Sequence, residues 1–168
     1  MSRSGRAPRQ RSRSVALQAL YAEDLAEAGK PDRSACVEEI FERVAQNFDL
    51  PISARDFALD LFRGTACHLT EIDALLSEHA VNWKISRMAV VDRNVLRLAI
   101  YELTRTETPV SVVLDEAIEL ARRFGAESSP GFVNGVLDAV ARQVRPETGA
   151  GAEVNVDATG CGEGRGIR

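Results

Sequence analysis

The residues best suited to chemistry stand at the start of the chain, where arginine recurs at short intervals. Residues 1–13 contain five arginines and no acidic residue: Arg3, Arg6, Arg9, Arg11 and Arg13. A guanidinium group presents its N–H donors in a planar fork that pairs with phosphate at two points. The spacing R-Q-R-S-R at residues 9–13 therefore predicts an anion site, with nucleic acid as the leading candidate ligand.

The charge of the remaining chain differs from that of this basic start. The whole sequence of 168 residues has a formal net charge of -4, so the part that follows the five arginines carries -9. A basic segment on an acidic body favours one local anion site over general binding of polyanions. We expect residues 1–12 to form a flexible arginine-rich arm that becomes ordered on RNA.

The sequence offers little for catalysis or metal binding. It contains neither a G-x-x-x-x-G-K-[ST] phosphate loop nor an H-E-x-x-H metal motif. His68 and His79 fit packed positions on one helix face, and Cys67 and His68, as helix neighbours, point about 100° apart. The cysteines, which include Cys36 and Cys161, lack metal-ligand spacing. We expect no catalytic residue, metal or cofactor, and reduced cysteines suit a cytoplasmic protein.

Apolar residues at spacings of three and four predict helices along most of the chain. The predicted helices cover residues 14–28, 37–48, 53–80, 89–106, 109–124 and 129–145. Ser53 and Asp56 resemble a capping box at the start of the third helix. Gly64 is expected either to divide that helix or to let a neighbour approach closely.

The helix at 89–106 has apolar residues around most of its circumference, which predicts a central and buried position. Its polar strip consists of Arg93, Asn94, Arg97 and Tyr101. The simplest interpretation is that the central helix meets water along this strip, and a functional role is the alternative.

The fold class that follows is all-α. No stretch alternates with period two and the predicted loops are short, so helices must pack on helices. We expect one helical domain at residues 13–145. Residues 146–168 are rich in glycine and poor in large apolar side chains, which predicts a disordered tail. No apolar run is long enough to cross a membrane.

Four blocks of sequence, in this order, resemble the bacterial transcription antitermination factor family NusB. They are R-S-R-S-V-A-L-Q-A-L-Y at 11–21, V-D-R-N-V-L-R-L-A-I-Y-E-L at 91–103, E-A-I-E-L-A-R-R-F-G at 116–125 and F-V-N-G-V-L-D at 132–138. The resemblance implies a compact bundle of about seven helices without enzymatic activity. It further implies binding of the boxA element of nascent ribosomal RNA transcripts together with the ribosomal protein NusE, in a complex that joins other Nus factors on RNA polymerase.

The resemblance also implies which residues bind. On the RNA side it points to Arg6, Arg9, Arg11, Arg13, Gln18, Tyr21 and Asp92. On the NusE side it points to Phe124, Glu127, Phe132 and Asn134. Solvent exposure is the alternative for Gln18, a core position is the alternative for Tyr21, and packing or capping is the alternative for the NusE-side residues.

Some positions depart from the family pattern, and other functions compete with the main one. Gln10 and Ser14 stand where family members often have a basic residue and a glutamate, and Ser128 stands where an aspartate is frequent. RNA affinity and partner contacts are therefore expected to be tuned differently. The competing functions are a protein-interaction module that forms a homodimer and a NusB-like accessory domain of a ribosomal RNA methyltransferase.

Overall fold

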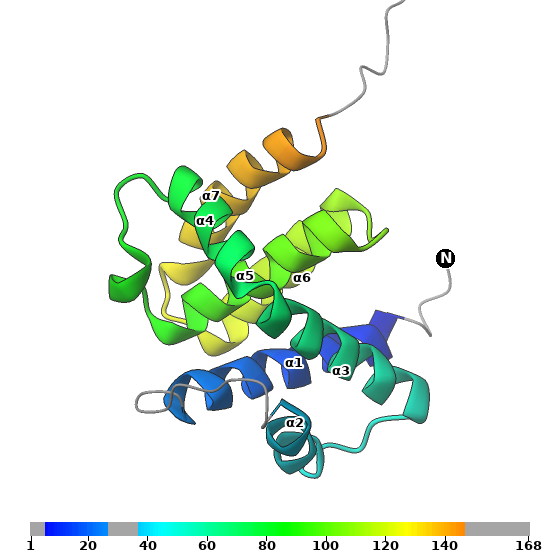
Figure 1. The fold of residues 1–168 in the computed structure, drawn as a ribbon. Helices are drawn as coiled ribbons and strands as arrows, with labels where there is room; N and C mark the ends of the chain where they lie inside the picture. The colour runs from blue at the N-terminus through cyan, green and yellow to red at the C-terminus, as the bar shows by residue number, and fades with distance from the viewer. Residues whose placement is uncertain (1–5, 27–36, 147–168) are drawn as a thin grey trace, which may run out of the picture.

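The computed structural model describes residues 6–26 and 37–146, and within them the chain forms seven α-helices and one short 3-10 turn (Figure 1). The elements in chain order are α1 (Arg6–Ala26), α2 (Val37–Ala45), α3 (Ile52–Cys67), α4 (Leu69–His79), η1 (Ile85–Arg87), α5 (Val90–Arg105), α6 (Val110–Phe124) and α7 (Ser129–Val144). The all-α prediction is confirmed. None of the described helices is long and apolar enough to span a membrane.

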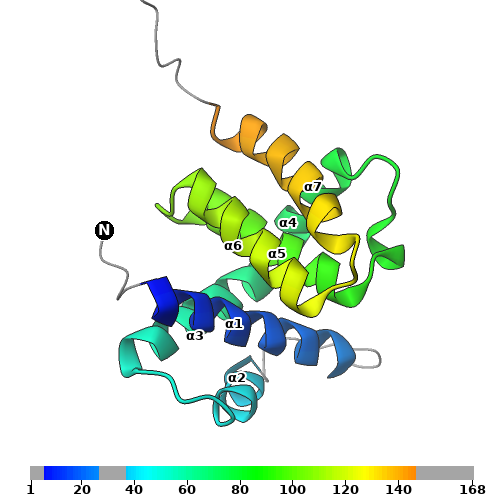
Figure 2. The same ribbon diagram turned by 180° about the vertical axis from the view of Figure 1, so that it is seen from behind.

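Helix α5 is the centre of the bundle, as its all-round apolar pattern predicts. It contacts α1 and α3 on one side and α4, α6 and α7 on the other. Its side chains Val95, Leu96 and Ile100 have no exposed surface. Helices α1, α2 and α3 pack on one another below α5 in Figures 1 and 2, while α6 runs alongside α5 and α7 lies above it, packed on α6.

The first helix begins earlier than predicted. It starts at Arg6 and not near Ser14, so residues 6–12 are helical and the expected flexible arm at 1–12 is wrong for this part. The side chain of Ser12 donates hydrogen bonds to the carbonyl oxygens of Pro8, at 3.0 Å, and of Ala54 in α3, at 2.7 Å. These bonds and the packing on α3 stabilise the early turns. Residues 1–5 and the predicted tail after Pro146 lie outside the described residues.

The helix from 53 to 80 divides, but not at Gly64. Helix α3 ends at Cys67 and α4 begins at Leu69, with His68 between them. The capping box at Ser53 is wrong, because α3 starts at Ile52 after Pro51 without a side-chain cap. Gly64 has the second role that the sequence predicted, which is to let a neighbouring helix approach closely. A Cβ atom there would overlap the ring of Tyr101, so the glycine lets α3 and α5 approach closely.

Candidate nucleic-acid interface

Helix α1 has one outward face that carries three of the predicted RNA contacts. Gln18 follows Arg11 by seven residues and Tyr21 follows Gln18 by three, which is the spacing of side chains on one helix face. Arg11 is exposed, Gln18 is half-buried and Tyr21 is 40% exposed. Tyr21 is therefore not a core residue. A cation, an amide and an aromatic ring in a row suit phosphate and base contacts.

Arg13 lies on the opposite side of α1 and is buried. Its Nε and Nη2 atoms donate to the two carboxylate oxygens of Glu102 in α5, at 2.8 and 2.6 Å. Only 3% of Arg13 and 2% of Glu102 is exposed. A guanidinium paired at two points inside the protein has no free fork for phosphate. The structure therefore separates Arg13 from the outward face, although the sequence grouped it with Arg11.

Arg9 is exposed like Arg11 but, like Arg13, it contacts an aromatic ring of α3. Its guanidinium carbon lies 5.5 Å from the centre of the Phe57 ring in α3, and that of Arg13 lies at the same distance from this ring. A cation over an aromatic face is held in place without losing its charge. Arg9 thus remains available to an anion. The side chain of Arg6 lies outside the described residues.

The end of α1 is fixed to α5 by a polar cluster around Asp24. Its Oδ2 atom accepts hydrogen bonds of 2.9 Å from Arg93 Nη2 and from Asn94 Nδ2. Burial alone would raise the pKa of Asp24, but the hydrogen bonds from Arg93 and Asn94 and the charge of Arg97 outweigh it and hold that pKa below its ordinary value. Asp24 is therefore an ionised structural anchor.

Arg97 joins this cluster to α4. Its Nε and Nη2 atoms donate to the two carboxylate oxygens of Asp73, at 2.8 and 2.7 Å, and its Nη1 lies 3.3 Å from Asp24 Oδ1. Burial would lower the pKa of Arg97, and the hydrogen bond and charge of Asp73, with the charge of Asp24, raise it instead. Asn94 is 1% and Arg97 8% exposed, so the interpretation that the strip meets water is wrong for these two residues, while Arg93 and Tyr101 are half-buried.

Asp92 occupies the first turn of α5, next to this cluster in sequence. The residue is half-buried, and its Oδ1 atom is buried with no hydrogen-bond partner among the described residues. An acid in the first turn complements the helix dipole, which is the ordinary account of this position. The sequence prediction of a place near RNA stays a prediction.

The predicted partner-side residues gather around the turn between α6 and α7. Phe124 ends α6 half-buried, Glu127 in the turn is exposed, and Asn134 in α7 is exposed. Phe132 is half-buried, and its ring lies 5.3 Å from that of Trp83 at an angle of 58°. In Figure 2 this turn faces the viewer, as does α1. Trp83 is the chain's single tryptophan.

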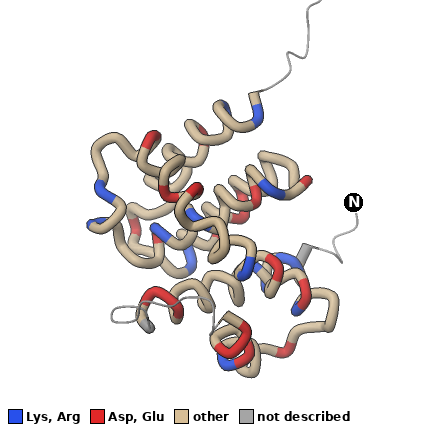
Figure 3. Tube along the Cα trace, viewed as in Figure 1, with Lys and Arg blue, Asp and Glu red and all other residues tan. Residues whose placement is uncertain are grey.

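Charged side chains of both signs are spread over the helices, as Figure 3 shows. Several form exposed ion pairs, such as Arg63 with Glu38 at 2.7 Å, and the hydrogen bond from Arg63 lowers the pKa of Glu38. Arg9 and Arg11 belong to the part of α1 that precedes its first acidic residue, Glu23. The positive potential of the described part of α1 is therefore concentrated at its start.

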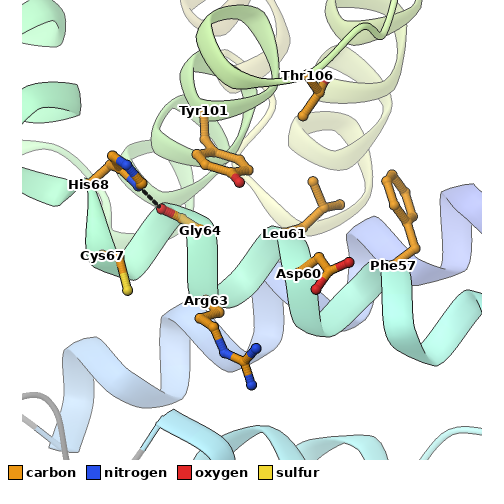
Figure 4. A pocket seen from close by; sticks show the side chains of 9 residues that line it. All are labelled: Phe57, Asp60, Leu61, Arg63, Gly64, Cys67, His68, Tyr101 and Thr106. Carbon is orange, nitrogen blue, oxygen red and sulfur yellow. Dashed lines mark hydrogen bonds between the residues drawn. The ribbon is translucent and has the colours of Figure 1, made fainter.

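A pocket between α3 and α5 is the place where a catalytic site would be sought. It has a volume of about 490 Å³ and is lined by Phe57, Asp60, Leu61, Arg63, Gly64, Cys67, His68, Tyr101 and Thr106 (Figure 4). His68 donates from Nδ1 to the carbonyl oxygen of Gly64 at 2.8 Å, and Cys67 points away from the imidazole. This arrangement pairs no base with the thiol. Among the described residues no group of His, Cys, Asp and Glu could hold a metal ion.

Comparisons with known proteins agree with the four sequence blocks. The sequence model of the NusB family matches residues 10–142. The transcription antitermination protein NusB of Anaeromyxobacter dehalogenans is 47% identical over 138 residues, which is 82% of this chain and 93% of the relative. These relatives are named as transcription antitermination proteins, so neither the interaction-module alternative nor the methyltransferase alternative is favoured.

Solved structures agree as well. The structure of T. maritima NusB has a TM-score of 0.71 at 38% identity, over 82% of this chain and 93% of that one. A crystal structure of the antitermination factors NusB and NusE in complex with dsRNA has a TM-score of 0.69 at 29% identity, over 82% and 98%. The seven-helix bundle, the sequence blocks and these matches lead to one conclusion: the chain belongs to the NusB family of transcription antitermination proteins.

Proposed function

We propose that the chain acts in transcription antitermination by binding boxA-type RNA through the outward face of α1, together with the ribosomal protein NusE. The observation that carries the proposal is the row of Arg11, Gln18 and Tyr21 on that face. Arg9 is also exposed, on the side of α1 that faces Phe57 of α3. A similar NusB structure contains both NusE and dsRNA, which supports these two classes of partner.

The action we propose is non-catalytic. A protein that holds a transcript and a ribosomal protein together raises the local concentration of other Nus factors at RNA polymerase, and this needs no reaction step. The Cys67–His68 arrangement is consistent with such a role, since it pairs no thiol with a base. We place this action in the cytoplasm, where bacterial transcription takes place.

NusE is proposed to contact the turn between α6 and α7. Glu127 and Asn134 are exposed there, and Phe124 and Phe132 offer partly exposed rings of the kind that protein interfaces favour. Ser128, also exposed, stands in this turn where family members often have an aspartate. The NusE contact at this point would therefore use a hydroxyl group and not a carboxylate.

The test is fluorescence anisotropy of labelled boxA RNA against the full chain, with and without NusE, over a series of salt concentrations. Arg11→Ala and Tyr21→Ala should weaken binding, whereas Arg142→Ala, a matched loss of an exposed arginine on α7, should not. Tighter binding to boxA than to a scrambled RNA, increased by NusE, is the expected result. Equal binding of boxA and scrambled RNA in every condition would overturn the proposal.

A further inference from the structure

The loop between α4 and α5, residues 80–89, presents the only tryptophan of the chain to solvent. Trp83 is 55% exposed, and its ring rests against Phe132 of α7. A tryptophan can bury about 150–250 Å² when it packs in a core. This one is held by another ring at its side while much of its surface faces outward, which is the arrangement of a stacking platform.

The backbone of this loop is fixed on both sides of the platform. Trp83 N–H donates to Ala80 at 2.8 Å, Arg87 N–H donates to Lys84 at 2.8 Å, and Met88 N–H donates to Ile85 at 3.2 Å. Ala80 and Met88 at the two ends are buried, at 4% and 6% exposed. The indole is thus presented by an anchored turn, and a ligand would meet it with little loss of loop entropy.

The charge of the loop is purely positive. Lys84 and Arg87 are both exposed, and the sequence from Val81 to Val91 contains no acidic residue, in a chain with a net charge of -4. Figure 3 shows the basic residues of this loop on the side of the molecule. Two cations next to an exposed ring attract an anion that also has a flat apolar face. Single-stranded nucleic acid combines these properties.

The loop is continuous with the outward face of α1. Arg93 donates to the carbonyl oxygen of Ile85 at 3.4 Å and to Asp24 at 2.9 Å, so one side chain connects the loop to the last turns of α1. Tyr21 precedes Asp24 by three residues, about one helical turn. In Figure 1 the loop and the end of α1 lie at the same side of the molecule, and Figure 2 agrees.

We infer that this loop is a second RNA-contact element, in which one unpaired base stacks on Trp83 while Lys84 and Arg87 neutralise the phosphates that flank it. The inference rests on the proposed function and extends it from α1 to the far end of that helix. It predicts that the path of the RNA runs from Arg11 past Tyr21 to Trp83. It also predicts a need for single-stranded RNA at this point, because a paired base is already stacked.

The single tryptophan makes the test direct. Every change in indole fluorescence of the full chain reports on Trp83 alone. Titration with single-stranded boxA RNA, in the absence of NusE, should quench this fluorescence along the same binding curve that the anisotropy of the labelled RNA gives. A fully paired RNA duplex should quench it far less.

Variants separate stacking from charge. Trp83→Ala should weaken RNA binding about tenfold, and Trp83→Phe should weaken it less because a ring remains. Lys84→Ala and Arg87→Ala should each reduce the slope of log affinity against log salt by about 0.7. Ile52→Ala, which removes another exposed apolar side chain at 80% exposure, should change neither quantity.

The two measurements distinguish failure of this inference from failure of the proposed function. RNA binding seen by anisotropy without quenching would overturn the inference and leave the function standing. Quenching that appears only when NusE is added would also overturn it, since a protein would then cover the ring. If neither signal appears with any RNA, both the proposed function and the inference fail.

Discussion

Arg13 and Glu102 are 89 residues apart in the sequence and form a two-point ion pair in the interior, with nitrogen–oxygen distances of 2.8 and 2.6 Å. The pair connects the third turn of α1 to the centre of α5. It orients the helix that carries Arg9 and Arg11 without itself facing the solvent. Arg13 is therefore expected to affect RNA only through the position of α1.

Replacing Arg13 with methionine should destabilise the protein, because Glu102 would be left as a buried and unpaired charge. Breaking one side of a buried pair costs about 3–5 kcal/mol. Urea unfolding would measure this loss, and the double variant Arg13→Met with Glu102→Leu should recover much of it, since an apolar pair replaces the ionic one. An Arg13→Met protein of unchanged stability whose RNA affinity depends less on salt would instead identify Arg13 as a phosphate contact.

Arg11→Ala should have the opposite pattern. The side chain is exposed on the outward face of α1, so its loss should change the unfolding free energy by less than about 0.5 kcal/mol. The slope of log RNA affinity against log salt should fall by about 0.7, the value for one phosphate of a single strand. The control is Arg142→Ala. A slope that Arg11→Ala leaves untouched would remove Arg11 from the RNA surface.

The arginines at the start of α1 also show how far the sequence could predict this site. Residue type and spacing indicated a basic anion site. The outward row of Arg11, Gln18 and Tyr21 depends on the helix starting at Arg6, whereas the sequence predicted a flexible arm up to residue 12. The burial of Arg13 does not follow from residue type and spacing, because it depends on Glu102, a partner far along the chain. The same holds for Arg97, whose partners Asp24 and Asp73 lie on two other helices.

The predicted helix starts are correct where local sequence signals mark them and wrong where contacts between helices determine them. Pro109 precedes α6 and Pro130 lies in the first turn of α7, so both helices begin within a residue or two of expectation. Helix α1 begins eight residues early because Ser12 binds the backbone of Ala54 on α3, a contact that no periodicity reveals. Trp83 lacks helical spacing, so the apolar pattern gave no reason to single it out.

Gly64→Ala tests the close approach of α3 and α5. Alanine favours a helix over glycine by about 0.5–1 kcal/mol, so an open position would be stabilised. Here the added methyl group would overlap the ring of Tyr101, and overpacking of this kind costs about 1–3 kcal/mol. We expect a lower Tm for Gly64→Ala. Gly131→Ala, at a helical glycine with open space around it, is the control. A Tm that rises in both variants would contradict the contact.

Asp24 gives the protein a predictable response to acid. Its pKa is lower in the folded chain than the value of about 3.9 for a free aspartate, so the stability from its contacts with Arg93, Asn94 and Arg97 is fully present above about pH 4. That stability is lost as the pH falls through the lower pKa of the folded state. Asp24→Asn should therefore cost about 1.5–3 kcal/mol near neutral pH.

The cost of Asp24→Asn depends on pH, because the wild-type carboxyl titrates and the amide does not. As the solution becomes acidic, the wild-type carboxyl takes up a proton and comes to resemble the amide, so the difference in unfolding free energy between the wild type and Asp24→Asn should shrink below about pH 4. Urea unfolding at a series of pH values measures this difference. Asp49→Asn, the same change at an exposed position, should show a small difference throughout. A difference for Asp24→Asn that grows on acidification would mean that the carboxyl is held protonated in the fold, opposite to the direction of its hydrogen bonds.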